Sequence, residues 1–259
     1  MAPGTVAVFS LPDPVPSDLT LAGFQQEAGF YHWPLAGQKQ GQGLALLAVP
    51  LKSKPGLVPL RLSWSGGTHL QWTNVMVGQD SYPRIHALRV PKLKKKLKAA
   101  AADNEKEILE DAEAEALGGA PLWRGSFQWP LEGRITVTSP FGVARVYNHG
   151  EAGWRHLGLD LRAAEGTPVL AANEGTVLLA RRRLHATGGT VVLGHGYGLS
   201  SSYFHLSKVL VHRGDLVVKG QVLGLSGSTG LANGPHLHWQ MDLRGIAVQP
   251  LQWVEAPLP

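Results

Sequence analysis

Two stretches of the chain carry hydrophobic patterns that predict β-strands. Between Thr5 and about Val77, short apolar runs are separated by proline and glycine, as in "TVAVFSL", "GLALLAVPL" and "PLRLSW". This rhythm predicts a small β-sandwich. After Pro121, β-branched runs alternate with glycine-rich turns, as in "GRITVTSPFG", "GTPVLAA", "GTVLLARR", "GTVVLGHG", "SSSYFHLS", "GQVLGLSGSTG" and "HLHWQM". These runs predict a second domain of antiparallel strands.

The segment between the two β-rich regions has a different composition. Residues 89–120 are rich in lysine, alanine and acidic residues, which favour a helix that ends at Gly118 and Gly119. Cations at its start and acids at its end oppose the helix dipole, so we expect this helix to lean on another part of the protein or to be partly mobile. The sequence thus predicts a mainly β chain with an N-terminal β-sandwich-like domain (1–80), a basic helical linker (81–120) and a C-terminal antiparallel domain (121–259).

The composition limits which residues can bind a metal but does not select one function. The 259 residues include no cysteine, so a metal must be held by histidine, aspartate or glutamate. No run of about 18 apolar residues predicts a membrane span, and the opening "MAPGTVAVFSLPDPV" lacks the pattern of a secretory signal. The net charge of +5 is compatible with an anionic partner such as nucleic acid, a membrane surface or a cell wall. No aromatic residues interleave the lysine run 92–98, so we expect a solvated face and no nucleic-acid site.

The stretch "GPHLHW", residues 234–239, places two histidines one residue apart in an apolar run. Side chains alternate along a strand, so His236 and His238 are predicted to share a face. The stretch "HLGLD" offers His156 and Asp160, with Gly158 between them to permit close approach of the backbone. With His238 these residues form an N, N, O ligand set, the usual number for a catalytic zinc that keeps a fourth position open.

The other histidines fall into two groups. If one histidine of the HLH pair binds metal, His236 and His205 in "SSSYFHLS" remain for proton transfer and oxyanion stabilisation. A structural zinc site or a stacked pair of core histidines is the alternative, although a structural site is expected to have four protein ligands. The remaining histidines are interpreted as satisfied or solvent-facing residues: His32, His69, His86, His149, His185, His195 and His212.

These motifs together resemble a known family. "HLGLD", "YFHLS" and "GSTGLANGPHLHW", preceded by "RITVTSPFGVAR" and followed by "GIAVQPLQW", resemble the lysostaphin/LytM-type zinc metallopeptidases, which cut peptide cross-links of bacterial cell wall. The resemblance extends from about residue 133 to 253. It implies a LytM-type domain whose central sheet forms the floor of a groove. It also implies one zinc ion bound by His156, Asp160 and His238, with His205 and His236 as the catalytic pair.

The resemblance also implies a substrate and a location, and it leaves a second function open. It predicts a zinc metalloendopeptidase that acts on peptidoglycan, in the cell envelope or outside the cell. The alternative is a latent or non-catalytic module that binds cell wall or activates another hydrolase, but members of that kind have usually lost some of the five residues. Leu231 and Ala232 depart from the commoner polar loop, which bears on substrate choice. The first domain resembles the β-rich module that precedes some peptidases of this family, and the oligomeric state is not indicated.

Overall fold

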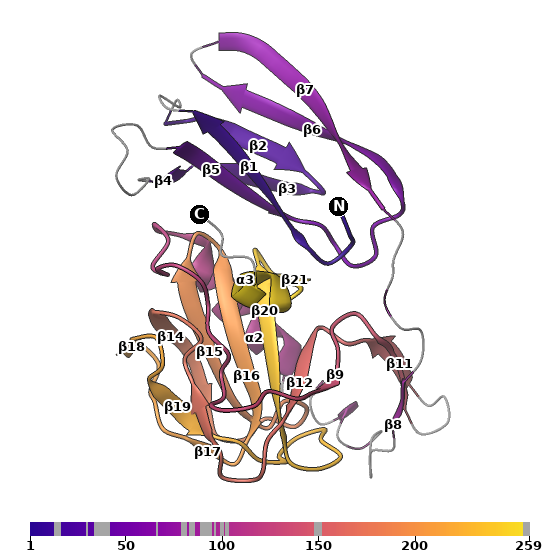
Figure 1. Ribbon diagram of the computed structural model, residues 1–259, viewed down its shortest axis with the longest axis vertical. Helices are drawn as coiled ribbons and strands as arrows, with labels where there is room; N and C mark the ends of the chain where they lie inside the picture. Colours follow the sequence, from indigo (N-terminus) through magenta and orange to yellow (C-terminus); the bar gives the residue numbers. More distant parts are fainter. Residues whose placement is uncertain are drawn as a thin grey trace. The chain divides into compact units, whose positions relative to one another are not determined.

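The structure is a computed structural model that describes residues 1–12, 17–29, 31–33, 42–65, 67–78, 82, 86–88, 95, 97–98, 101, 104–147 and 152–255. The chain divides into two compact units, the first built on residues 1–81 and the second on residues 82–257. Their elements are labelled in Figure 1. Among the described residues, no helix combines the length and apolar character that crossing a membrane requires.

The first unit consists of two antiparallel sheets. One has the strand order β1-β5-β4 and the other the order β3-β2-β6-β7. Their strands are β1 (Val6–Pro12), β2 (Thr20–Gly23), β3 (Gln26–Gly29), β4 (Tyr31–Trp33), β5 (Gln42–Ala48), β6 (Gly56–Trp64) and β7 (Gly67–Val77). Both sheets supply side chains to one core, which includes Ala7, Leu21, Leu47, Leu60 and Val77. Two sheets around a shared core confirm the predicted β-sandwich-like architecture.

A large sheet organises the second unit. Its strand order is β18-β14-β15-β16-β20-β12-β9, and β21 pairs with β20. The strands are β9 (Val137–Ser139), β12 (Gly158–Arg162), β14 (Gly175–Arg181), β15 (Gly189–Gly196), β16 (Leu199–Leu206), β18 (Leu216–Val217), β20 (His236–Leu243) and β21 (Ile246–Val248). The strand pairings within this sheet are antiparallel, as predicted for the C-terminal domain.

Shorter elements complete the second unit. Two smaller sheets have the orders β11-β10-β8 and β13-β19-β17. Their strands are β8 (His86–Leu88), β10 (Ala144–Tyr147), β11 (Ala152–Arg155), β13 (Pro168–Leu170), β17 (Lys208–Val209) and β19 (Val222–Leu225), and helix α3 (Leu251–Glu255) follows the last strand. The register between β8 and β10 places His86 beside Arg145, so a strand from before residue 121 supports the strand that carries Arg145.

The helical segment is interrupted at Asn104, because residues 95, 97, 98 and 101 are helical and helix α2 begins after this break. Helix α2 spans Glu105–Ala114 and continues as a 3₁₀ turn, Glu115–Leu117, which ends at the predicted glycine stop. Asn104 has a left-handed backbone (φ 50°), which separates α2 from the preceding residues. The true start places Glu105 and Glu107 in the first turn, where the helix dipole favours acids. The predicted dipole conflict was therefore wrong for α2, because it assumed one uninterrupted helix from the lysine run to Gly118.

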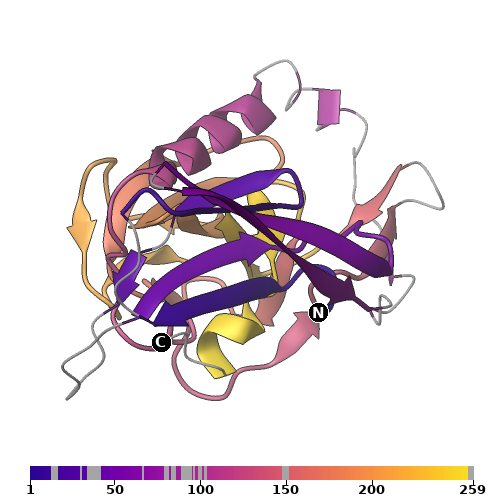
Figure 2. The same ribbon diagram turned by 90° about the horizontal axis from the view of Figure 1, so that it is seen from above.

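Helix α2 packs against the large sheet, in agreement with the expectation that it leans on another element. Ala112 and Ala116 form a buried cluster with Leu178 and Leu179 of β14 and Val192 of β15. The helix lies behind the sheet in Figure 1 and is seen along its length near the top of Figure 2. Most of the lysine run lies outside the described residues, so its interpretation as a solvated face stays a prediction.

Of the two interpretations of His195, satisfied or solvent-facing, the structure shows the first, because it lies in β15 and is fully buried. Its Nδ1 lies 2.6 Å from the Glu174 carbonyl oxygen and its Nε2 lies 2.8 Å from Ser201 Oγ. Ser201 in turn donates to the Tyr203 hydroxyl at 3.0 Å. Burial lowers the pKa of His195 to about 4, so this imidazole is neutral at pH 7.

This buried imidazole predicts a loss of stability in acid. The folded-state pKa of about 4 lies below the unfolded value of about 6.5, so the unfolded chain binds the proton first as the pH falls. The stability is complete above about pH 6.5 and is lost toward pH 4. We expect His195→Gln to flatten the pH dependence of the unfolding free energy by up to about 1.4 kcal/mol per pH unit. Urea unfolding of the metal-free protein between these pH values measures it, and an unchanged slope would contradict the assignment.

Candidate metal centre

The centre of the site is the pairing of strands β12 and β20. In this antiparallel pair, Asp160 lies directly opposite His238. Directly opposite residues in such a pair point to the same face, so the register alone brings the two side chains together. The next pair along, Leu161 and Leu237, is fully buried on the opposite face. An apolar layer on one side of the sheet thus supports a polar site on the other.

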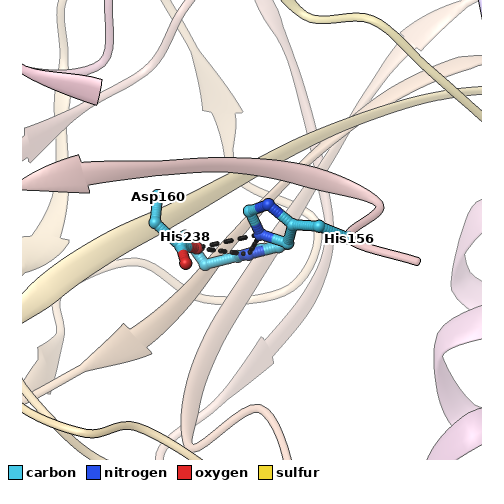
Figure 3. Close-up of side chains that lie close together, drawn as sticks. All are labelled: His156, Asp160 and His238. Carbon is cyan, nitrogen blue, oxygen red and sulfur yellow. Dashed lines mark hydrogen bonds and ion pairs between the residues drawn. The ribbon is translucent and has the colours of Figure 1, made fainter. Parts of the chain in front are cut away.

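His156 reaches the same place from the loop that precedes β12. Its backbone is fixed by two hydrogen bonds with residues 142 and 143: Gly142 N donates to the His156 carbonyl, and His156 N donates to the Val143 carbonyl. Its Nε2 lies 3.0 Å from Asp160 Oδ1 and 3.0 Å from His238 Nδ1. His238 Nδ1 is 2.9 Å from the same carboxylate oxygen. Figure 3 shows the three side chains converging on one point.

The second nitrogen of each imidazole in this group faces an oxygen acceptor. His156 Nδ1 is 2.8 Å from the Pro140 carbonyl oxygen, and His238 Nε2 is 3.4 Å from Gln240 Oε1. The Gln240 amide donates to both carboxylate oxygens of Asp242, at 3.0 and 2.9 Å, which turns its own oxygen toward His238. An oxygen acceptor requires the hydrogen on the nitrogen that faces it. The lone pairs of His156 Nε2 and His238 Nδ1 are therefore available to a metal.

Asp160 is held by a buried cation on its other side. Arg145 Nη2 donates to Asp160 Oδ2 and also, at 2.9 Å, to Ser139 Oγ. Burial alone raises the pKa of Asp160, but its polar contacts with the rings of His156 and His238 outweigh burial and hold that pKa well below its ordinary range. Burial lowers the pKa of His156 to about 4. An ionised carboxylate and a neutral imidazole are the protonation states that metal ligation requires.

His205 and His236 lie beside this group. Their ring centroids are 4.8 Å apart, and the ring of His205 is 6.1 Å from that of His238. His205 Nδ1 faces the Thr229 carbonyl oxygen at 2.8 Å, and His236 Nδ1 faces the Gly234 carbonyl oxygen at 2.8 Å. Both rings thus keep Nε2 for other partners, and His236 Nε2 lies 3.8 Å from Asp160 Oδ1. The structure brings all five predicted site residues together.

His205 reaches this face only because the strand is irregular. Phe204 pairs with His238 and stacks on its ring, with centroids 5.2 Å apart and planes at 2°. Regular alternation would send the next side chain to the opposite face. Instead, Phe204 and His205 both lie opposite Thr190 in a β-bulge, and His205 has a left-handed backbone (φ 65°). The bulge turns the His205 imidazole back toward the site.

Several of these contacts were not predicted from the sequence. Arg145, Gln240 and Asp242 received no role, although Arg145 closes the quoted run "RITVTSPFGVAR". Burial raises the pKa of Asp242 to about 7. A sequence shows no ion pair or bulge, since both depend on strand register. Among the remaining histidines, His212 is exposed, His149 lies outside the described residues, and the side chains of His32, His69 and His86 are likewise not described.

Comparison with known proteins identifies this domain. Residues 154–250 match the family described as peptidase family M23. This part of the chain belongs to peptidase family M23. The match includes all five site residues, four histidines and one aspartate, and it confirms the resemblance found in the sequence motifs.

Two curated relatives share this M23 domain. The chain is 39% identical over 133 residues to an uncharacterized metalloprotease of Haemophilus influenzae, which covers 51% of this chain and 28% of that protein. It is 36% identical over 141 residues to the peptidoglycan DD-endopeptidase ShyA of Vibrio cholerae, covering 54% of this chain and 32% of that protein. The chain therefore spans about a third or less of the length of these relatives.

A solved structure resembles nearly the whole chain. It is the crystal structure of a Pseudomonas aeruginosa protein assigned to peptidase M23, with a TM-score of 0.70 and 27% identity. The similarity covers 98% of this chain and 95% of that one. The N-terminal β-rich unit and the M23 domain therefore occur together in a second protein.

The glycine of "HLGLD" gives a test of the site. A Cβ atom at Gly158 would lie 2.5 Å from the Trp239 carbonyl oxygen and 2.7 Å from His238 Nε2, so Gly158→Ala must displace the His238 ring. We expect about 10- to 100-fold weaker Zn²⁺ binding with the fold retained, measured by competition with a chelator and by circular dichroism. Gly234→Ala is the matched control, because a Cβ atom there meets open space. Wild-type affinity in Gly158→Ala would show that the close approach does not matter.

Proposed function

We propose that this protein is a zinc-dependent metalloendopeptidase that hydrolyses peptide cross-links of bacterial peptidoglycan in the cell envelope. The observation that carries the proposal is the convergence of His156, Asp160 and His238 in an M23 domain, with His205 and His236 beside them. We also propose that residues 121–259 form the catalytic part, with 1–80 as an accessory domain.

The ligand set suits zinc. Two imidazole nitrogens and one carboxylate oxygen are the donors of many catalytic zinc sites, and three protein ligands leave a position for water. The three donor atoms lie 2.9–3.0 Å apart, close to the roughly 3.3 Å that tetrahedral ligation at about 2.0–2.1 Å requires. A zinc ion bound here would supply Lewis-acid activation of a water molecule and of the scissile carbonyl group.

The side chains of this protein supply the remaining functions. His205 and His236 present Nε2 from rings whose Nδ1 atoms are tied to carbonyl oxygens. Burial lowers the pKa of His205 to about 3, so this imidazole is neutral at pH 7. Together, the two imidazoles transfer the proton of the attacking water and stabilise the negative charge that develops on the carbonyl oxygen. Arg145 orients the Asp160 carboxylate through its hydrogen bond to Oδ2.

The curated relatives point to the type of cross-link. ShyA of Vibrio cholerae is named a peptidoglycan DD-endopeptidase, and a 37% identical protein of Neisseria meningitidis is named a DD-carboxypeptidase/endopeptidase. We therefore propose that the bond cleaved here is the D,D cross-link between two stem peptides, in preference to a glycine bridge. The net charge of +5 is compatible with this anionic polymer.

The division of roles predicts two classes of variants. His205→Ala and His236→Ala should keep one zinc per chain but lose about 100-fold or more in hydrolysis rate, because proton transfer and oxyanion stabilisation are removed. His156→Ala, Asp160→Ala and His238→Ala should lose the metal itself. Elemental analysis and turnover of purified peptidoglycan measure the two effects, with chelation and zinc restoration of the wild type as the control. An empty site in His236→Ala together with an active, zinc-loaded His238→Ala would reverse the assignment.

The substrate is tested with defined muropeptides. We expect the zinc-loaded protein to split D,D-cross-linked dimers into monomers and to leave glycine-bridged dimers intact. Mass spectrometry of the products identifies the bond, and His205→Ala serves as the inactive control. Cleavage of the glycine bridge alone would reject the proposed cross-link while keeping the proposed peptidase.

A further inference from the structure

A glutamate outside the matched M23 segment is tied to the loop that joins strands β14 and β15. Glu105, in the first turn of helix α2, is only 3% exposed. Its carboxylate accepts hydrogen bonds from Ala186 N at 2.9 Å, from Thr187 N at 2.8 Å and from Thr187 Oγ1 at 2.9 Å. A buried carboxylate with several donors fixes the position of the backbone that supplies them.

This loop in turn holds His205. The Thr187 carbonyl oxygen accepts a hydrogen bond from His205 N at 2.8 Å. The Ala186 carbonyl oxygen accepts one from Leu231 N at 2.7 Å, which ties the loop to the segment whose Thr229 carbonyl faces His205 Nδ1. Thr187 therefore connects Glu105 to the backbone of His205, through its N–H on one side and its carbonyl oxygen on the other.

His205 is a residue for which such support matters. Its left-handed backbone and its place in a β-bulge are unfavourable for a residue with a side chain, and such a conformation persists only where the surroundings enforce it. If the hydrogen bond to Thr187 moves, the bulge can relax and the imidazole can turn away from His236. The contacts of the three metal-ligand candidates do not pass through this loop.

We propose that Glu105 is a positioning residue for His205, acting through the backbone of Ala186 and Thr187. This role rests on the proposed peptidase function, in which His205 is catalytic. Helix α2 is then part of the support of the active site, because Ala112 and Ala116 hold the helix on the sheet while Glu105 fastens the loop.

The kinetic test uses the full-length chain loaded with zinc. We expect Glu105→Ala to lower kcat about 10- to 100-fold, because a displacement of about 1 Å at a reacting group can cost 100-fold. The KM and the zinc content should stay within about threefold of wild type. Glu105→Gln should recover much of the kcat, because its amide oxygen can still accept hydrogen bonds from Thr187. Unchanged kcat in Glu105→Ala would overturn the proposal.

Two controls separate positioning from loss of stability. Glu107→Ala removes an exposed carboxylate from the same helix turn and should leave kcat unchanged. Asp111→Gly weakens the helix at an exposed position without touching the loop, and assays far below the Tm compare it with Glu105→Ala. Equal losses of kcat in Asp111→Gly and Glu105→Ala would mean that stability alone is responsible, and would overturn the proposal.

An NMR experiment tests the positioning without relying on activity. In the ¹⁵N-histidine-labelled full chain, His205 should show a hydrogen on Nδ1, bound to the Thr229 carbonyl, and its signals are assigned from His205→Ala. Glu105→Ala should shift or broaden these signals, whereas Glu107→Ala should not. If the wild type cleaves no peptidoglycan, the proposed function fails but this measurement still decides the positioning. Unchanged His205 signals in Glu105→Ala would overturn the positioning.

Discussion

Four imidazoles meet at this site because each gives one ring nitrogen to a fixed oxygen. Backbone carbonyls of Pro140, Thr229 and Gly234 face three of the rings, and the Gln240 side-chain oxygen faces the fourth. Each hydrogen bond selects a tautomer and leaves the other nitrogen's lone pair directed at the centre. Without these acceptors, the same side chains could rotate or exchange tautomers, and their lone pairs would have no fixed direction. The direction of these lone pairs thus depends on the carbonyl oxygens of three backbone groups and one glutamine side chain.

The side chains of the site are positioned by sheet pairing and by exceptions to it. The regular pairing of β12 with β20 sets Asp160 against His238. The irregular pairing of β15 with β16 turns His205 toward the same face. A regular sheet provides two ligands on one strand pair, whereas a residue on the neighbouring strand needs the bulge to reach them. Regular strand pairing therefore positions Asp160 and His238, and the bulge positions His205 beside them.

The sequence predicted the parts of the site that follow from local periodicity. Alternation placed His236 and His238 on one face, and Gly158 was expected at a close approach, which the structure shows against His238. The family resemblance supplied the pairing of His205 with His236. The contribution of Arg145 and the conformation of His205 could not be predicted, because both depend on which strands are neighbours. The break before α2 was not predicted, because the composition of the segment around the left-handed Asn104 favours helix throughout.

The acceptor carbonyl of Pro140 and the cation Arg145 both precede residue 154, where the family match begins, and Glu105 lies earlier still. The segment that the family match covers is therefore smaller than the physical unit that shapes the centre. Recombination of that segment alone between proteins would carry the ligands along but not every group that orients them. Each protein that acquires the domain has to supply a group that holds the loop beneath His205, as Glu105 does here. The sequence before the domain can therefore diverge only as long as it keeps such a contact.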